Sequence, residues 1–128
     1  MIVVAALIKA EGKLLVCQRR RTDSFGLMWE FPGGKLEHGE TPSEALAREL
    51  QEELGVVAQI GPEIFRTRHR YFELGEELDL IFFGATVDAA AVRNLAFEKM
   101  EWREPQTLHE LNFLPADREF VTKLAKQT

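Results

Sequence analysis

Seven consecutive apolar residues, from Ile2 to Ile8, stand near the start of the chain. A strand with one face in water alternates apolar and polar residues, whereas a continuous apolar run is typical of a strand covered on both faces. We therefore expect residues 2–8 to form an inner strand of a sheet that is covered on each side. Residues 14–18 are expected to form a hairpin with it, through a turn at residues 11–13.

The rest of the chain contains strand-like and helix-like segments, without repeats or linkers. Further strands are expected at residues 29–31, 63–74, 78–87 and 100–103, and helices at residues 42–54 and about 116–126. Residues 32–34 are expected to be a break and residues 75–77 a turn. At 128 residues the chain fits one domain, residues 1–128, and its elements indicate an α/β or α+β class with a mixed sheet.

The composition limits what the protein can bind. Its net charge is −5 at pH 7, whereas binding to polymeric nucleic acid needs a basic surface. The apolar runs are shorter than the ~18 residues of a membrane span, and the single cysteine excludes an internal disulfide. We therefore expect a cytoplasmic protein with no polymeric nucleic acid and no membrane among its partners. A small phosphorylated ligand is compatible with this charge if divalent cations lie between the two.

Residues 41–55 carry the start and stop signals of a helix. Thr41 is a favourable N-cap, Pro42 suits the first helical position, and Glu44 completes a Thr-x-x-Glu capping box. Gly55 favours the left-handed backbone conformation that ends many helices. The pattern predicts a helix over residues 42–54.

Three glutamates share one side of this predicted helix. Glu49, Glu52 and Glu53 are spaced at i, i+3 and i+4, where like charges repel one another unless a cation compensates. The neighbouring buried stripe is expected to consist of Leu46, Leu50 and Leu54. The helix alone leaves two interpretations open. One is a solvated acidic face with Arg48 and Glu52 as an ion pair, and the other is a site for Mg²⁺, which prefers oxygen ligands.

The surrounding sequence resembles a known motif. From Gly34 the chain is GKLEHGETPSEALARELQEELGV, which fits the Nudix signature G-x5-E-x7-R-E-U-x-E-E-x-G-U, where U is a bulky aliphatic residue. The matching residues are Gly34, Glu40, Arg48, Glu49, Leu50, Glu52, Glu53, Gly55 and Val56. The segments WEFPGGK and PADREFV extend the resemblance to MutT-like nucleoside triphosphate pyrophosphohydrolases of the Nudix superfamily. This resemblance implies the Nudix fold, an α/β/α sandwich around a mixed sheet, in which the box forms a loop–helix–loop.

The resemblance also implies a metal site. In the family, the glutamates that match Glu49, Glu52 and Glu53 bind divalent metal together with a main-chain carbonyl, here that of Gly33. The implied cofactor is Mg²⁺, with Mn²⁺ as a substitute. Glu49 is expected to be either a metal ligand or the base that activates water. Arg48 would complete the catalytic set by orienting a carboxylate with its planar guanidinium group.

Other residues are expected to support this site. Gly34, Glu40 and Gly55 would shape the box, with Glu40 supporting its loop or an outer metal. Many Nudix enzymes recruit a further glutamate from a loop before the last strand. Glu98 is our candidate for this metal ligand, with Glu101 as the second choice and a solvated surface role as the alternative.

By the same resemblance, water attacks the β-phosphorus of a nucleoside triphosphate and releases the monophosphate and pyrophosphate. Metal ions are needed because a carboxylate does not otherwise approach a polyphosphate of like charge. The leading hypothesis is hydrolysis of oxidised nucleotides such as 8-oxo-dGTP, in nucleotide pool sanitation and DNA repair. The alternatives are a CTP, dCTP or 5-methyl-dCTP pyrophosphohydrolase and a non-catalytic Nudix-fold nucleotide-binding module. The expected partner is a small nucleotide, and the protein is expected to be a monomer or homodimer.

Two residues outside the box are candidates for substrate binding. Arg19 follows the second strand, where MutT-like enzymes place an arginine on the nucleotide's phosphate. Asp117 stands where the family's type enzyme has an asparagine that contacts oxidised guanine, and relatives with aspartate act on cytosine nucleotides or several oxidised purines. An ionised carboxylate accepts hydrogen bonds, which suits the exocyclic amino groups of cytosine or guanine. The alternative role of Asp117 is to cap or begin the last helix.

Arginines also alternate along residues 66–70 and face one side of a strand: Arg66, Arg68 and Arg70. An exposed basic face of the sheet and a wall for phosphate or base are both compatible with this pattern. For the aromatic residues Trp29 and Phe31, core packing is the preferred interpretation over stacking on a base.

Overall fold

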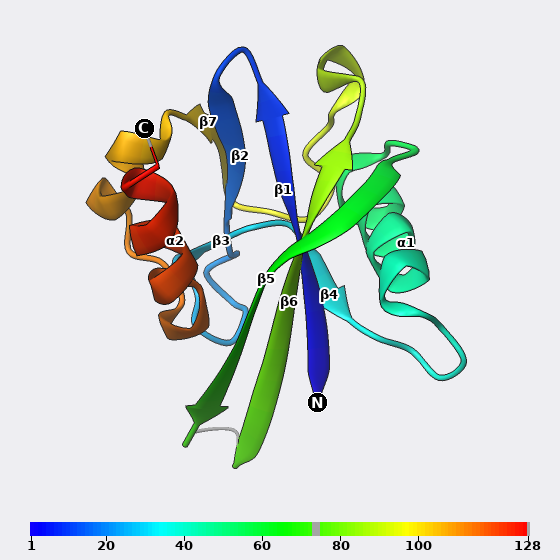
Figure 1. The fold of residues 1–128 in the computed structure, drawn as a ribbon, viewed down its shortest axis with the longest axis vertical. Helices are drawn as coiled ribbons and strands as arrows, with labels where there is room; N and C mark the ends of the chain where they lie inside the picture. Colours follow the sequence, from blue (N-terminus) through cyan, green and yellow to red (C-terminus); the bar gives the residue numbers. More distant parts are fainter. Residues whose placement is uncertain (73–74, 128) are drawn as a thin grey trace.

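The computed structural model describes residues 1–72 and 75–127. Within them, a mixed sheet lies between two helices, with α1 (Pro42–Leu54) on one face and α2 (Arg118–Ala125) on the other, as Figure 1 shows. The expected sandwich of helices around a mixed sheet is therefore confirmed. None of the described helices is long and apolar enough to cross a membrane.

The sheet is built around β1 (Ile2–Ala10), which runs parallel to β6 (Glu76–Thr86) and antiparallel to β2 (Lys13–Gln18). The remaining strands are β3 (Trp29–Glu30), β4 (Gly33–Lys35), β5 (Gln59–Tyr71) and β7 (Lys99–Arg103). The strand order is β3-β2-β1-β6-β5, with β4 paired to β1 and β7 paired to β2. The prediction of an inner first strand that forms a hairpin with the second is confirmed.

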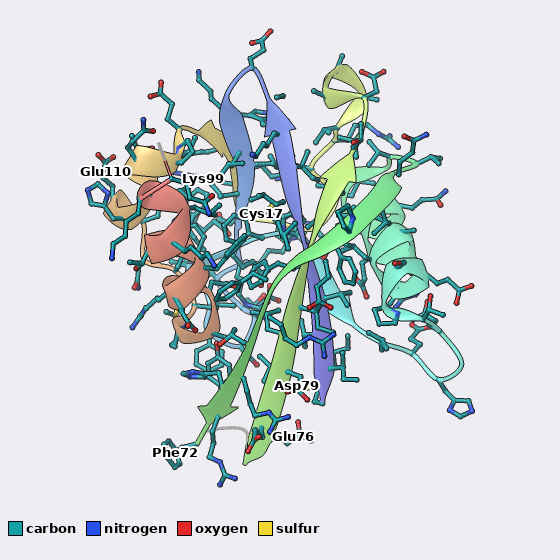
Figure 2. The ribbon with its side chains drawn as sticks, in the orientation of Figure 1. Cys17, Phe72, Glu76, Asp79, Lys99 and Glu110 are labelled. Atoms are coloured by element: carbon teal, nitrogen blue, oxygen red, sulfur yellow. The ribbon has the colours of Figure 1, made fainter. Side chains whose placement is uncertain are left out.

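Side chains on opposite faces of β1 enter two separate cores. Val4, Ala6 and Ile8 pack in the core under α1, together with the predicted leucine stripe of that helix. Ala5 and Leu7 pack in the core under α2. Because successive side chains of a strand alternate between its faces, residues 4–8 of the apolar run are buried on both faces, whereas Ile2 is exposed. Cys17 of β2 is also fully buried, near the centre of the view in Figure 2.

The partner of β1 changes along its length. Its last two residues pair with β2, whereas Val3, Val4 and Ala5 pair with β4. The predicted break at residues 32–34 is wrong in this respect, because residues 33–35 form a short strand. Glycine permits the close approach, since a Cβ at Gly33 would collide with the carbonyl oxygen of Val4. β1 therefore changes partner along its length, and the segment of β1 that pairs with β4, together with β4 itself, lines a pocket.

Several element boundaries differ from the predictions. β5 begins at Gln59 rather than residue 63, because Gly61 and Pro62 lie in an irregularity of the register between β5 and β6 and do not end the strand. β6 begins at Glu76, within the predicted turn. Part of the predicted strand over residues 63–74 lies outside the described residues. The last helix begins at Arg118, after a 3₁₀ turn at Pro115–Asp117.

Candidate active site

Helix α1 has the predicted bounds and caps. The Thr41 hydroxyl oxygen accepts a hydrogen bond from the backbone N–H of Glu44 at 3.2 Å, and Glu44 accepts one from the N–H of Thr41 at 2.9 Å. Gly55 ends the helix in the left-handed conformation, with φ of 67°. The capping box and glycine C-cap therefore fix the angular position of every side chain between them.

Arg48 is the centre of a carboxylate network on α1. Its Nε and Nη2 donate to the two carboxylate oxygens of Glu40, at 2.7 and 3.0 Å. Its Nη1 lies 2.9 Å from Oε1 of Glu49 and 3.4 Å from the carboxylate of Glu52. Nη2 also donates to the carbonyl of Lys35 at 3.1 Å. One guanidinium group therefore joins three carboxylates of the box and ties the helix to the loop before it.

Glu53 is the most perturbed carboxylate in this region. Burial, reinforced by the nearby charges of Glu30 and Glu49, raises the pKa of Glu53 to about 9. Its hydrogen bond comes from the backbone N–H of Gly33, at 3.0 Å. Burial also raises the pKa of Glu49, against the opposing effect of Arg48. Both carboxyl groups therefore hold a proton more strongly than an exposed glutamate does, and a cation bound beside them would oppose that shift.

The donor atoms of this region fit a hard divalent cation, because carboxylate and carbonyl oxygens are the ligands that such ions prefer. Among the described side chains, no three acidic, histidine or cysteine groups already converge as a metal cluster. Arg48 contacts Glu49 and Glu52, while Glu53 is bonded to the backbone of Gly33. The described residues therefore supply suitable donor atoms for a divalent cation without already converging on one point.

Gly34 is required by the position of Glu49. A Cβ at Gly34 would lie 2.5 Å from the carboxyl carbon of Glu49. The same carboxylate accepts a hydrogen bond from Nη1 of Arg48 at 2.9 Å. Glycine at position 34 therefore leaves the space in which the Glu49 carboxylate lies.

A pocket of about 300 Å³ extends from Glu53 to the segment before α2, and Glu49 and Glu52 lie outside its lining. Glu53, Gly33 and Gly34 line one part of it, and Asp117 lines another. This volume is at the lower end of the range for small-ligand sites. The pocket thus brings a box glutamate and the predicted specificity residue, which are far apart in the sequence, to one cavity.

Asp117 is a buried carboxylate, with 3 % of its surface exposed. Burial, with a smaller contribution from the charge of Glu30, raises its pKa well above the usual value. Asp117 stands at the N-cap position directly before α2, but its side chain makes no capping hydrogen bond, so a capping role of the side chain is excluded. No hydrogen bond to this carboxyl group is found within the described residues. It therefore lines the pocket as a polar group without a protein partner.

Aromatic side chains form part of the pocket wall. Phe25, Phe31 and Tyr71 all line it. The rings of Phe25 and Tyr71 lie 5.1 Å apart, and Phe25 has a left-handed backbone with φ of 56°, which is strained for a residue other than glycine. Sequence reasoning missed Phe25 and Tyr71, because neither belongs to a motif and the contact between them is purely tertiary.

Arg19 lines the pocket but already has partners. Its Nη1 lies 3.2 and 3.3 Å from the two carboxylate oxygens of Glu30, and its Nε donates to the carbonyl of Ser24 at 2.7 Å. Burial raises the pKa of Glu30, while the charge of Arg19 opposes that shift. Glu30 was not predicted as a site residue. The available signal was an acidic residue between two aromatic residues that were expected to be in the core.

Glu98, in the loop before β7, and Glu101, in β7 itself, lie outside the pocket lining. Glu98 is exposed, and Glu101 bonds to Arg103 at 2.9 Å. The loop itself is anchored beside the box helix, because the N–H of Leu95 donates to the carbonyl of Glu53 at 3.0 Å. A metal-binding role for Glu98 stays a prediction.

The alternating arginines of β5 are exposed and paired with acidic residues on the same sheet. The pairs are Arg66 with Glu63, Arg68 with Glu77 and Asp79, and Arg70 with Glu77. Figure 2 shows Asp79 and Glu76 toward the end of the sheet where β5 finishes and β6 starts, and Phe72 is exposed at the same end. None of the three arginines lines the pocket, so the structure agrees with an exposed charged face.

Comparisons with known proteins agree with this geometry. A model of the NUDIX domain matches residues 1–124. The chain is 34 % identical over 116 residues to the CTP pyrophosphohydrolase of Escherichia coli, which covers 90 % of this chain and 84 % of that protein. It is also 34 % identical over 129 residues to the 8-oxo-dGTP diphosphatase of Haemophilus influenzae, with coverage of 98 % and 92 %.

Solved structures show the same fold. The E. coli ORF135 protein superposes with a TM-score of 0.80 at 29 % identity, over 94 % of this chain and 85 % of that one. The MutT protein from Methanosarcina mazei superposes with a TM-score of 0.86 at 24 % identity, over 98 % and 93 %. With the domain match and the curated relatives, these structures lead to one conclusion. The chain belongs to the Nudix hydrolase family.

Proposed function

We propose that this protein is a Mg²⁺-dependent pyrophosphohydrolase that cleaves a (deoxy)nucleoside triphosphate to the monophosphate and pyrophosphate. Its proposed substrates are oxidised nucleotides such as 8-oxo-dGTP. The observation that carries the proposal is that one pocket has both Glu53 and the unpartnered Asp117 in its lining. Phosphates need the acidic residues and their cation, whereas a base needs the aromatic walls and a hydrogen-bonding group.

At the acidic end, Glu49, Glu52, Glu53 and the carbonyl of Gly33 would hold the metal, with Mn²⁺ as a substitute for Mg²⁺. When bound, such a cation neutralises phosphate oxygens and lowers the pKa of water. Glu49 either joins the ligands or accepts the proton of the attacking water. Arg48, 2.9 Å from Oε1 of Glu49, determines how that carboxylate is oriented.

At the other end, the raised pKa of Asp117 favours a neutral carboxyl group. A neutral carboxyl group has one O–H donor and one carbonyl acceptor. 8-Oxoguanine presents an N7–H donor beside the O6 acceptor, which complements this pair, whereas ordinary guanine presents two acceptors at the same edge. A protonated Asp117 therefore supplies the same donor and acceptor as an asparagine amide. This differs from the ionised acceptor that the sequence suggested.

A cytosine nucleotide is the second candidate, because cytosine presents the N3 acceptor beside the N4 amino donor and complements the same carboxyl group. The similarity to a protein named CTP pyrophosphohydrolase supports this alternative. The third alternative is a non-catalytic nucleotide-binding module. Such a module would bind a nucleotide and release no pyrophosphate from it.

The test is pyrophosphate release with Mg²⁺ from 8-oxo-dGTP, dGTP, CTP, dCTP and 5-methyl-dCTP, with the nucleoside product identified. The proposal predicts 8-oxo-dGTP as the best substrate, with kcat/KM at least about fivefold above that of dGTP, because a mismatched buried hydrogen bond costs about 1–3 kcal/mol. If CTP, dCTP or 5-methyl-dCTP is the best substrate, the proposed substrate changes from 8-oxo-dGTP to a cytosine nucleotide. Nucleotide binding without pyrophosphate release from any of them would overturn the hydrolytic function.

A further inference from the structure

Tyr71 is a buried polar residue of the pocket that no motif includes. It is the last residue of β5, with 6 % of its surface exposed, and it lines the same pocket as Asp117. Its hydroxyl oxygen accepts a hydrogen bond from the backbone N–H of Ala116 at 3.0 Å. The hydroxyl group is therefore one peptide unit from Asp117, so both can contact the same ligand.

The position of the Tyr71 hydroxyl is fixed from several directions. Its ring centroid lies 5.1 Å from that of Phe25 and 4.5 Å from that of His69. The bond from Ala116 then locates the oxygen atom. A side chain held by two ring contacts and one hydrogen bond is pre-organised for ligand binding, because little freedom is lost when the ligand arrives.

The proton of this hydroxyl group is available to a ligand. A tyrosine hydroxyl donates one hydrogen bond and accepts others, and here only its acceptor side is used within the described residues. Burial raises the pKa of Tyr71, so the group keeps its proton at neutral pH. A buried donor without an acceptor is unfavourable, and a carbonyl oxygen in the pocket would remove that cost.

We propose that Tyr71 is a specificity-determining residue whose hydroxyl group donates a hydrogen bond to a carbonyl oxygen of the bound base, beside the contact made by Asp117. This inference rests on the proposed nucleotide substrate. The pair would favour bases that carry a carbonyl group, such as 8-oxoguanine and cytosine, over adenine, which has none. Tyr71 thereby adds the requirement for a carbonyl group on the base, which the carboxyl group of Asp117 does not impose alone.

The experiment measures binding of nucleoside monophosphates by calorimetry, which does not depend on turnover. The ligands are 8-oxo-dGMP, dCMP and dAMP, and the proteins are wild type, Tyr71→Phe and Thr67→Val. Thr67 is the matched control, because its hydroxyl lies on the same strand and donates to Glu119 at 3.0 Å, outside the pocket lining. Tyr71→Phe is expected to weaken binding of the better carbonyl-bearing ligand by about 3- to 10-fold and that of dAMP by less than about twofold. Thr67→Val is expected to leave both affinities unchanged.

A ligand-side measurement keeps the protein intact and distinguishes this role from a structural one. In 2-thio-CMP, sulfur replaces the single carbonyl oxygen of cytosine and is a weaker acceptor. Wild type is expected to bind 2-thio-CMP less tightly than CMP, whereas Tyr71→Phe is expected to bind the two alike. If Tyr71 only holds Ala116 in place, the variant will weaken every ligand equally and retain the preference for CMP, and the inference is overturned.

Failure of the inference and failure of the proposed function give different results. A wild type that prefers carbonyl-bearing monophosphates, loses the preference in Tyr71→Phe and releases no pyrophosphate would overturn the function and support the role of Tyr71. Pyrophosphate release with an unchanged preference in Tyr71→Phe would overturn the role of Tyr71 alone. A wild type that neither binds these monophosphates nor hydrolyses their triphosphates would overturn both.

Discussion

The backbone N–H of Gly33 donates a hydrogen bond to Oε1 of Glu53 across 3.0 Å and so joins β4 to the end of α1. The next residue, Gly34, lies against the carboxylate of Glu49. Two adjacent glycines therefore determine where two glutamates of the helix can lie. The loop before the helix and the helix itself act as one unit in forming the acidic end of the pocket.

Substitution of Gly34 by alanine should damage activity through Glu49. The added Cβ would lie 2.5 Å from the carboxyl carbon of Glu49, so that carboxylate must move. A displacement of about 1 Å at a catalytic group can cost roughly 100-fold in rate, and a loss of 10- to 100-fold in kcat/KM is expected. Gly84→Ala is the control, because its Cβ would meet no atom within 4 Å. Equal activities of the two variants would contradict the role given to Glu49.

Replacement of Arg48 by lysine should lower activity although the charge is kept. Arg48 donates to both oxygens of Glu40 while its Nη1 contacts Glu49, and lysine lacks the planar group needed for these simultaneous bonds. Groups that orient metal ligands typically contribute 10- to 100-fold in activity or metal affinity, and steady-state kinetics at several Mg²⁺ concentrations would measure the loss. Arg66→Lys, on an exposed pair with Glu63, is the control. Full activity in Arg48→Lys would show that charge alone suffices.

The acidic helix was the most predictable part of this protein. Thr41, Glu44 and Gly55 act through bonds within a few residues, so the sequence contains the whole cause of the helix bounds. The spacing of Glu49, Glu52 and Glu53 then follows from helix geometry. By contrast, the start of β5 could not be located, because Gly61 and Pro62 end many strands and here are accommodated by an irregular register with β6.

The rest of the pocket depends on contacts between distant segments. Phe25, Glu30, Tyr71 and Asp117 lie on different loops and strands, and only the folded sheet brings them to one cavity. Asp117 could be named because the resemblance to a family marked its position. Phe25 and Tyr71 have no such marker, since their roles come from burial and from contact with each other. Local sequence patterns do not contain that information.

Mg²⁺ should stabilise the folded protein by mass action. The folded chain places buried carboxylates near one another, whereas the unfolded chain does not, so the cation binds the folded state preferentially. At 100 times its Kd, a ligand adds about 2.7 kcal/mol to the free energy of unfolding, which corresponds to roughly 10 °C in Tm. Thermal melting with EDTA, with Mg²⁺ and with matched ionic strength from NaCl would measure this. A Tm that rises equally with NaCl, or that rises with Mg²⁺ as much in Glu52→Gln as in wild type, would argue against the assigned ligands.

The stability of Asp117→Asn relative to wild type should depend on pH. Burial raises the folded-state pKa of Asp117 well above its value in the unfolded chain. Between these two pKa values the folded state holds a proton that the unfolded state has released, so the free energy of unfolding falls as pH rises. Asparagine does not titrate, so this loss is absent from the variant. Above the unfolded pKa, the free energy of unfolding of the variant should therefore rise relative to that of wild type by at most about 1.4 kcal/mol per pH unit. Urea unfolding of both proteins from about pH 5 to about pH 8 would measure the difference, and a constant difference would show that Asp117 titrates normally.

The most direct test of the central claim is pyrophosphate release from 8-oxo-dGTP with Mg²⁺ by wild type, Glu53→Gln and Glu44→Gln. Glu44→Gln is the matched control on the same helix, because glutamine at this position also completes a capping box. Wild type and Glu44→Gln are predicted to release pyrophosphate at similar rates, whereas Glu53→Gln should lose activity by about 100-fold or more while keeping its fold. A Glu53→Gln variant that turns over as fast as wild type would contradict the assignment of the acidic end of the pocket as the catalytic metal site.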